Sequence, residues 1–217
     1  MNEKDLEKLV FGIAHQIRNP CAIILANARI AQSDKDISEK VYRSLESVVN
    51  GAKYIESRLD EFVEFSKPLI LKYKELSLNQ LAREVESIVN ENCRIKRIRL
   101  ASHFDANIIL TKADRQQLLL AILNVVLNAI ESITESGTIS LRCREAEPND
   151  ELIVEDNGIG IHPRDLPEVF SPFYSTKQGG LGIGLAVAKR IIEAHKGKIS
   201  LESQSGKGTI VKIVLPK

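Results

Sequence analysis

The sequence contains few of the residues that mark disulfide-rich, metal-clustered or aromatic-cored proteins. Its 217 residues include no Trp, one Met and three Cys, and aromatic residues make up 5%. Cys21, Cys93 and Cys143 lie far apart without a Cys-x-x-Cys pair, so neither a zinc site nor a disulfide framework is expected. We expect reduced thiols that serve as small apolar side chains in a cytoplasmic protein. The core must then rest on Ile, Leu, Val and Ala.

Long apolar runs and an excess of one charge are also missing. The longest uninterrupted apolar runs, residues 21–26 and 118–123, are six residues each, whereas a membrane span needs about 20. The first residues show no signal-peptide pattern. The net charge is +1, from 30 Lys and Arg against 29 Asp and Glu, and a nucleic-acid binder usually shows a clear basic excess. We therefore expect a globular segment with no nucleic-acid partner and no membrane contact.

Two long helical patterns open the chain. Apolar residues recur at steps close to three and four in the first, and alternate steps of four and three in the second, which is typical of bundle packing. A short polar turn at residues 33–36 predicts an antiparallel hairpin, and Pro68 ends the second helix. Because each helix buries only one stripe, we expect two copies to form a homodimeric four-helix bundle. The predicted stripes are Leu6, Val10, Ile13, Ile17, Ile24 and Ala31, then Val41, Leu45, Val48, Ala52, Ile55, Leu59 and Phe62.

After Pro68 the pattern changes to mixed helices and strands. Ser77 opens a capping box for a helix to about residue 92, and Asp114 can cap a strongly apolar helix through residue 133. Hairpin-linked strands among helices indicate an α+β sandwich, with domains at residues 1–67 and 68–217. The expected strands are 98–104, 138–145, 151–155, 198–203 and 209–215, with a helical turn near 164–170 and a last helix at 185–195.

A proline lies inside the first helix, close to a histidine. Residues 14–20 read Ala-His-Gln-Ile-Arg-Asn-Pro, and a proline within a helix removes a hydrogen bond and kinks the helix, at a cost of about 3 kcal/mol. We expect Pro20 to distort the backbone near His15, whose ring lies just off the apolar stripe and within reach of solvent. Alone, His15 would be an ordinary surface histidine, but Asn19 and Pro20 argue against that reading. Neutral imidazole is a good nucleophile.

Two further motifs place polar groups next to apolar elements. Asn124 and Asn128 lie four residues apart and so share one helix face. They are either hydrogen-bonded amides or oxygen ligands suited to Mg²⁺. Asp156 ends an apolar strand and is followed by Gly158 and Gly160, which can meet the edge of a ligand or form a simple turn.

A glycine-rich stretch, residues 179–184, runs into the last helix. It reads Gly-Gly-Leu-Gly-Ile-Gly, and free N–H groups at a helix start attract phosphate. It is not a Walker loop, which ends in Gly-Lys-Ser/Thr, nor a dinucleotide fingerprint, because Leu185 takes the place of the third glycine. Each glycine motif is weak by itself.

Taken in order, the motifs resemble the transmitter core of the sensor histidine kinases of two-component systems. The resemblance covers nearly the whole chain. The wording of residues 15–20 and the short lid ending at 175–177 look most like the nitrogen-regulation branch. Residues 14–20 look like the phosphoacceptor box, 124–129 like the N box, 156–160 and 180–185 like the two glycine boxes, 170–174 like the F box, and 206–216 like the closing strand.

This resemblance implies a dimerisation and histidine-phosphotransfer hairpin followed by an ATP-binding domain of the Bergerat type. His15 would take the γ-phosphoryl group of ATP and pass it to an aspartate of a response-regulator receiver domain. Asn128 would hold Mg²⁺, with Asn124 beside it, and Asp156 would accept from the adenine amino group. The remaining residues implied in ATP binding are Gly158 and Gly160 at the adenine, Lys177, Gly180, Gly182 and Gly184 at the phosphates, and Thr209, which would support the adenine end of the pocket.

Gln16 departs from the family pattern, which usually has Glu or Asp directly after the histidine. A carboxylate there acts as general base and contributes about 10²–10⁴-fold, whereas an amide cannot take a proton. Autophosphorylation is then slow, or water or another group serves, or Gln16 is an introduced substitution. By family analogy Asn19 would orient water for dephosphorylating the regulator, so the alternative function is a kinase-poor variant that acts mainly as a response-regulator phosphatase.

Two other classes stay open on the sequence. One is a dimeric scaffold whose nucleotide domain only senses ATP, against which the intact asparagine and glycine boxes argue. The other is a chaperone- or topoisomerase-type ATPase of the same fold. Those enzymes need a water-activating Glu near the position of Asn124, and they lack the helical hairpin. His103, His162 and His195 are expected to be structural or solvated.

Overall fold

The computed structural model describes residues 3–34, 36–104, 109–146, 148–177 and 180–217. The chain divides into two compact units, Met1–Pro68 and Leu69–Lys217, here called the hairpin unit and the sheet unit. Each is described by itself. Among the helices of the described residues, none is both long and apolar enough to cross a membrane.

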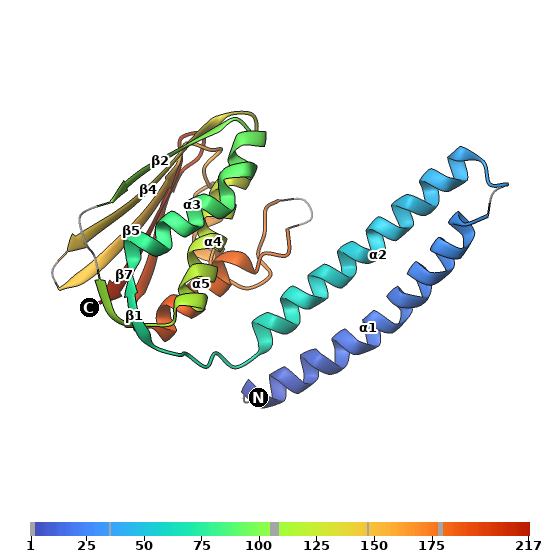
Figure 1. Cartoon of the computed structure of the whole chain (residues 1–217), viewed down its shortest axis with the longest axis horizontal. Helices are drawn as coiled ribbons and strands as arrows, with labels where there is room; N and C mark the ends of the chain where they lie inside the picture. The colour runs from blue at the N-terminus through green and yellow to red at the C-terminus, as the bar shows by residue number, and fades with distance from the viewer. Residues whose placement is uncertain (1–2, 35, 105–108, 147, 178–179) are drawn as a thin grey trace. The chain divides into compact units, whose positions relative to one another are not determined.

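The hairpin unit consists of two antiparallel helices, α1 (Glu3–Gln32) and α2 (Glu39–Ser66) (Figure 1). Pro20 lies inside α1, which continues without interruption on both sides of it. Because proline has no backbone N–H, the carbonyl of Gln16 loses its helical donor there. The effect of Pro20 therefore falls on the turn that follows His15, and it does not end the helix.

The seam between α1 and α2 is built mainly from small and medium apolar side chains. Val10 and Ala14 of α1 form a buried cluster with Leu59 and Val63 of α2. Farther along the seam Cys21, Ala28, Val49 and Ala52 are also buried.

Much of the predicted apolar stripe is not part of this seam. Six of its larger residues are 38–47% exposed, so they do not pack against the other helix of the same hairpin. The smaller residues allow the two backbones to approach, and the larger ones form a second, open apolar row. These six are Ile13, Ile17, Ile24, Val41, Val48 and Ile55.

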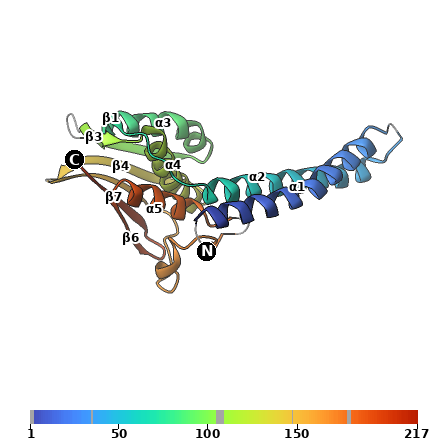
Figure 2. The same ribbon diagram turned by 90° about the horizontal axis from the view of Figure 1, so that it is seen from below.

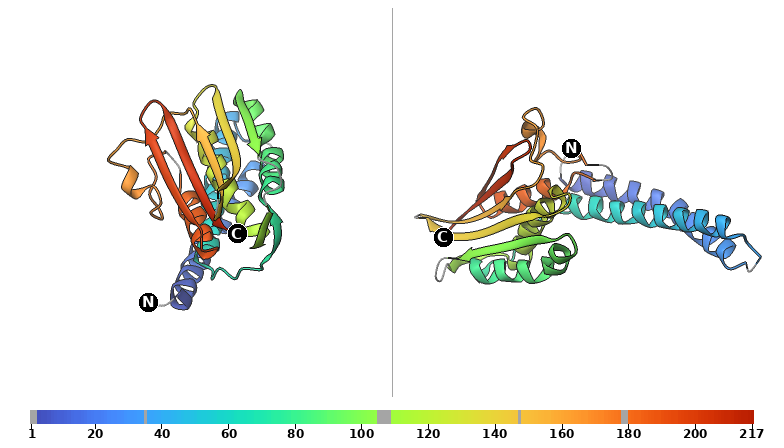
Figure 3. Two further views of the ribbon diagram at one scale, coloured as in Figure 1. Left: turned by 90° about the vertical axis from the view of Figure 1, so that its left-hand side faces the viewer. Right: turned by 90° about the horizontal axis from the view of Figure 1, so that it is seen from above.

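The sheet unit confirms the α+β class. Its main sheet has the order β2-β4-β5-β7-β6; β2 and β4 are parallel and the other neighbours antiparallel. Helices α3, α4 and α5 lie on one face of this sheet (Figure 3). The bounds are α3 Leu78–Ile95, β2 Ile98–Phe104, α4 Arg115–Ser132, β4 Gly137–Ala146, β5 Asn149–Asp156, α5 Gly184–Ala194, β6 Lys198–Gln204 and β7 Gly208–Pro216.

Three short elements complete the unit. Strands β1 (Lys74–Ser77) and β3 (Ile109–Ala113) form a two-stranded antiparallel sheet beside α3 (Figure 2). Neither strand was predicted from the sequence. The helical turn expected near residues 164–170 is a single 3-10 turn, Leu166–Glu168.

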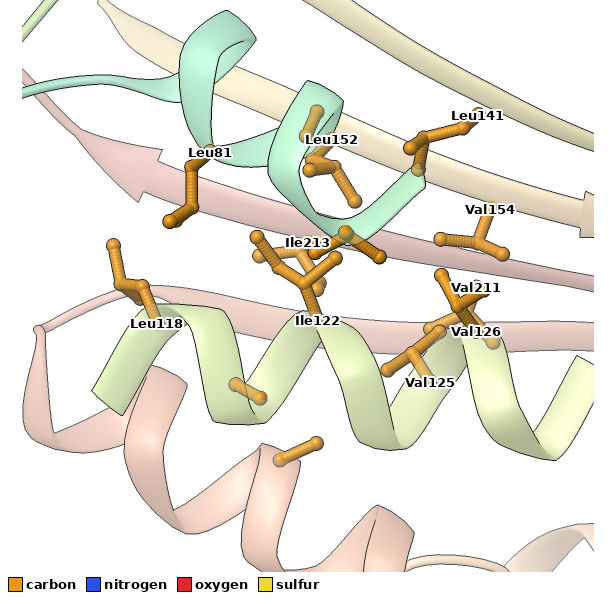
Figure 4. Packing of buried hydrophobic residues seen from close by; sticks show 14 of the residues in the cluster. Leu81, Leu118, Ile122, Val125, Val126, Leu141, Leu152, Val154, Val211 and Ile213 are labelled. Atoms are coloured by element: carbon orange, nitrogen blue, oxygen red, sulfur yellow. The ribbon is translucent and has the colours of Figure 1, made fainter. Parts of the chain in front are cut away.

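Helix α4 is fixed in place by its cap and by its apolar face. The Asp114 side chain accepts from the backbone N–H of Gln117 at 3.0 Å and closes the first turn. Leu118, Ile122 and Val126 then pack against side chains of β4, β5 and β7, including Leu141, Leu152 and Ile213 (Figure 4). Burying each such side chain stabilises the fold by about 1.5–3 kcal/mol. The polar residues of α4 are therefore held rigidly relative to the sheet.

Candidate active site

A row of three polar residues runs along α4 at one-turn spacing: Asn124, Asn128 and Ser132. Residues four apart lie one above the other on a helix. The amide of Asn124 donates from Nδ2 to the carbonyl of Leu120 at 2.9 Å, and its Oδ1 lies next to Gly184, the first residue of α5. The first two members of the row were predicted from the sequence, whereas Ser132 was not, although the spacing of four continues to it.

Lys177, at the end of the segment predicted as the lid, contacts Asn128 in the middle of this row. Its Nζ donates to Oδ1 of Asn128 at 2.7 Å and to the carboxylate of Glu131 at 2.9 Å. Lys177 and Asn128, both implied at the phosphates, are thus in direct contact, and the amide oxygen of Asn128 already faces a cation. Glu131 belongs to the same cluster, and its surface position on α4 gave no signal in the sequence.

Asp156 lies at the end of β5 and is 7% exposed. Its Oδ1 accepts from the Ser132 hydroxyl and from the backbone N–H of Gly158, both at 2.9 Å. Burial raises the pKa of Asp156. The hydrogen bonds from Gly158, Ser132 and the Thr209 backbone, and the charge of Lys177, oppose this, but the net pKa stays above its ordinary value.

The glycines after Asp156 are required by close approach. A Cβ at Gly158 would lie 2.0 Å from the Ser132 hydroxyl oxygen and 2.7 Å from the Ser132 carbonyl oxygen. Gly160 has φ +65°, and a Cβ there would lie 2.0 Å from the carbonyl oxygen of Gln204. Only glycine satisfies both conditions. The segment is thereby pressed against the end of α4 on one side and against the β6–β7 turn on the other.

Thr209 lies on β7 directly opposite Asp156 and is buried. Its hydroxyl is 2.9 Å from the hydroxyl of Ser203, which in turn donates to the carbonyl of Gly208 at 2.8 Å. Ser203 also accepts from the backbone N–H of Ile161 at 2.9 Å. Thr209 therefore belongs to a hydroxyl network on the strand that pairs with the end of β5 at Asp156.

The second glycine box connects the lid to α5. The backbone N–H of Gly180 donates to the carbonyl of Lys177 at 3.3 Å, and the carbonyl of Gly182 accepts from the N–H of Phe173 at 3.0 Å. Gly184 begins α5 and abuts Asn124. Gly179, the first glycine of this motif, lies outside the described residues.

The hairpin unit carries the remaining predicted residues. His15, Gln16 and Asn19 are exposed on α1, which confirms that the ring of His15 is accessible. Arg18, one turn after Ala14, pairs with Asp60 of α2 at 2.5 Å. This pair holds the two helices together next to the exposed histidine.

His195 has a structural role, as expected. Its Nε2 accepts from the backbone N–H of Asp114 at 2.9 Å, so the hydrogen is on Nδ1, which lies 2.8 Å from the carbonyl of Ile191. The Asp114 carboxylate also accepts from the backbone N–H of Lys72 at 2.7 Å. The segment that enters the sheet unit is thus tied to the start of α4 and the end of α5.

Comparison with known proteins identifies the family of this site. Residues 113–217 match the family described as histidine kinase-, DNA gyrase B- and HSP90-like ATPases. The solved catalytic domain of the histidine kinase ThkA is 32% identical; the match covers 67% of this chain and 96% of that one, with a TM-score of 0.62. The chain belongs to the sensor histidine kinases. The expectation of this family is confirmed, whereas the nitrogen-regulation branch stays a prediction.

Longer relatives show how much of such a protein the chain represents. The signal transduction histidine-protein kinase AtoS of Escherichia coli K12 is 32% identical over 213 residues, which is 97% of this chain and 35% of AtoS. A crystal structure of ThkA in complex with the response regulator protein TrrA is 28% identical, covers 97% of this chain and 61% of that one, and has a TM-score of 0.72. This chain spans only 28–48% of the length of the curated relatives that it matches.

Proposed function

We propose that the chain is the kinase core of a two-component system. It phosphorylates His15 from ATP and passes the phosphoryl group to an aspartate of a response-regulator receiver domain. The observation that carries this proposal is the arrangement on α4. One helix brings an amide oxygen that faces a cation, at Asn128, within one turn of the hydroxyl that holds the buried carboxylate of Asp156. Membership of the histidine kinase family supports it, as does the ThkA complex with a response regulator.

The side chains of this row fit an adenine nucleotide. Asp156 is a buried acceptor suited to the amino group of adenine, and Gly158 and Gly160 bring backbone close beside it. Thr209 lies behind the carboxylate on β7. About 6 Å farther along α4, one turn away, Asn128 begins the phosphate end. Base and phosphates would therefore be recognised from successive turns of one rigid helix.

The phosphate end also fits Mg²⁺. The Oδ1 of Asn128 accepts a hydrogen bond from the Lys177 ammonium at 2.7 Å. Amide oxygens of this kind are hard ligands that suit Mg²⁺. When bound, the ion would neutralise charge on the β- and γ-phosphates. Asn124 lies one turn away on α4, and Lys177 with the amides of Gly180, Gly182 and Gly184 would neutralise the rest. Phosphoryl transfer depends mainly on such positioning and charge stabilisation.

His15 supplies the nucleophile. Its neutral ring would attack the γ-phosphorus, forming an N–P bond as the bond to the departing ADP oxygen breaks, and the ring proton then leaves. Gln16 can accept a hydrogen bond but cannot take this proton. Because His15 is exposed on α1, we propose that water takes the proton. Attack by a carboxylate oxygen of the receiver aspartate on this phosphorus would then break the N–P bond, and the ring nitrogen would take a proton back from water, which restores the neutral imidazole.

Labelled ATP tests the kinase reaction. Incubation with γ-labelled ATP and Mg²⁺ should give acid-labile label on the wild type that is lost in His15→Ala and in Asn128→Ala. The label should move to a cognate receiver domain. Label that survives His15→Ala would refute the acceptor, and full labelling of Asn128→Ala would refute the metal ligand. Nucleotide binding without label would favour the phosphatase alternative.

The open apolar row of the hairpin supports a homodimer. Ile17, Ile24, Val41, Val48 and Ile55 stay 38–47% exposed on the two helices, and a second hairpin would cover them in a four-helix bundle. Ile24→Asp should therefore convert the dimer to a monomer in light scattering after size exclusion. Ala22→Asp, which places the same charge on an exposed position outside the row, should not. A monomeric wild type, or a dimeric Ile24→Asp, would contradict this assembly.

A further inference from the structure

We propose that Ser132 is a positioning residue that orients the Asp156 carboxylate and so gives the site its preference for adenine over other purines. This inference rests on the proposed function, because it assumes that the site binds ATP. Ser132 is the last residue of α4 and the third member of the polar row, one turn beyond Asn128. It is 8% exposed, so its hydroxyl must find a partner within the protein.

Two donors meet on one oxygen of Asp156. The hydroxyl of Ser132 and the backbone N–H of Gly158 both lie 2.9 Å from Oδ1. One comes from α4 and the other from the loop that follows Asp156 itself. Together they fix the orientation of the carboxylate plane. Only the Ser132 hydroxyl connects the carboxylate to a side chain of α4, whereas the N–H of Gly158 belongs to the backbone that follows Asp156.

The Ser132 hydroxyl has a single hydrogen and two acceptors within reach. The carbonyl oxygen of Ala129 lies at 2.8 Å and Oδ1 of Asp156 at 2.9 Å. A hydrogen bond to an ionised carboxylate is about twice as strong as one to a neutral carbonyl. The hydrogen therefore goes to Asp156 as long as that group is ionised. The ionised carboxylate of Asp156 is also the form that can accept a hydrogen bond from the amino group of adenine.

The backbone around Ser132 shows that removing its hydroxyl leaves the wall of the site intact. The carbonyl of Ser132 accepts from the N–H of Ile159 at 3.0 Å. This bond is made by the backbone and does not need the hydroxyl. Alanine also favours the helix, so Ser132→Ala removes the hydrogen bond to Asp156 while the helix and the glycine box stay in place.

Purine selectivity is the property that depends on this orientation. Adenine presents an amino group as donor, whereas hypoxanthine has a carbonyl oxygen at the same position, which a carboxylate repels. A well-oriented Asp156 therefore favours ADP and disfavours IDP. Hydrogen bonds to charged groups contribute about 1.5–3 kcal/mol, so loss of the orienting bond should reduce the ratio of ADP to IDP affinity by about tenfold or more.

The test measures ADP and IDP binding to the full chain by isothermal titration calorimetry. In Ser132→Ala the Kd for ADP should rise about tenfold, and the Kd for IDP should stay within about twofold of wild type. Ser132→Cys, of similar volume but with a weak donor, should resemble Ser132→Ala. The matched control is Ser102→Ala on β2, which removes a serine hydroxyl that donates to the carboxylate of Glu86 on α3. It should change neither constant.

A double-mutant cycle excludes a merely structural role. If Ser132 acts through Asp156, Ser132→Ala should not change the ADP to IDP ratio further in an Asp156→Ala background. Equal loss of ADP and IDP affinity in Ser132→Ala, unchanged selectivity, or an undiminished effect in the double variant would each overturn the inference. A wild type that binds no nucleotide would instead refute the proposed function, and this inference with it. Thermal unfolding of each variant checks that it is folded.

Discussion

Gly160 offers a quantitative test of how tightly the adenine end is packed. The φ of +65° costs a residue with a Cβ about 1–2 kcal/mol. In addition, the Cβ of Ala at this position would lie 2.0 Å from the carbonyl oxygen of Gln204, a backbone atom that cannot simply rotate away. Relieving such a collision by backbone shifts costs about 1–3 kcal/mol more. Gly160→Ala should therefore lower the free energy of unfolding of the sheet unit by about 2–5 kcal/mol.

Gly206 provides the matched control. It has φ +78° in the neighbouring β6–β7 turn, yet a Cβ there would meet nothing within 4 Å. Gly206→Ala should therefore cost only the backbone strain, about 1–2 kcal/mol. The difference between the two variants isolates the collision with Gln204.

Urea titration followed by circular dichroism measures both free energies. Hydrogen exchange of β5 and β7 peptides assigns the transition to the sheet unit. Gly160→Ala should unfold at clearly lower urea than Gly206→Ala and should also bind ADP more weakly, because the segment beside Asp156 must shift. Equal midpoints for the two variants would show that the close approach to Gln204 is not a constraint on the fold, and the packing argument would fail.

Three further substitutions test separate parts of the chain. Gln16→Glu should raise the rate of autophosphorylation by providing a proton acceptor; an unchanged or lower rate would refute the general-base argument. Glu131→Gln should tighten ADP binding about two- to threefold with little change in stability, because it releases Lys177 and removes a negative charge near the phosphates; weaker binding in calorimetry would contradict this. Asp114→Asn should reduce the loss of stability on acidification. Burial raises the Asp114 pKa, but the backbone amides of Lys72, Gln117 and Gln116, together with His195, outweigh the effect of burial and leave the pKa lowered. The stabilisation by the Asp114 carboxylate is therefore present above about pH 4 and lost as the pH falls through the lower pKa of the folded state. Urea midpoints of the wild type and the variant between pH 7 and pH 3 test this prediction, and parallel curves would refute it.

Much of the sheet unit follows from local patterns in the sequence. The Asp114 cap and the apolar face of α4 predict that helix to within a residue, since capping and core packing act on the same segment. Strands β1 and β3 were missed because they are four and five residues long and pair with each other across the chain. No local pattern encodes a pairing between residues more than thirty positions apart.

The hairpin seam and the site show a different limit. A heptad-like stripe locates an apolar face but does not say which of two adjacent rows meets the other helix of the hairpin. Ala14 and Cys21, which the predicted stripe did not include, are buried in the seam, whereas Ile17 and Ile24 are exposed. Asn128 and Asp156 were recognisable because an amide or a carboxylate beside apolar residues is costly unless it is used. A serine at a helix end is common, so the role of Ser132 emerges only from its distance to Asp156.

The polar row on α4 has a consequence for the kinds of change that this chain can tolerate. Successive residues of a helix are rotated by about 100°. A single inserted or deleted residue between Asn124 and Ser132 would turn one end of the site away from the other while leaving every side chain type unchanged. The same change would also rotate half of the apolar face out of the sheet. In α4 the length of the segment is thus under stricter constraint than the identity of most of its residues, and substitution, not insertion, is the route by which this site can vary.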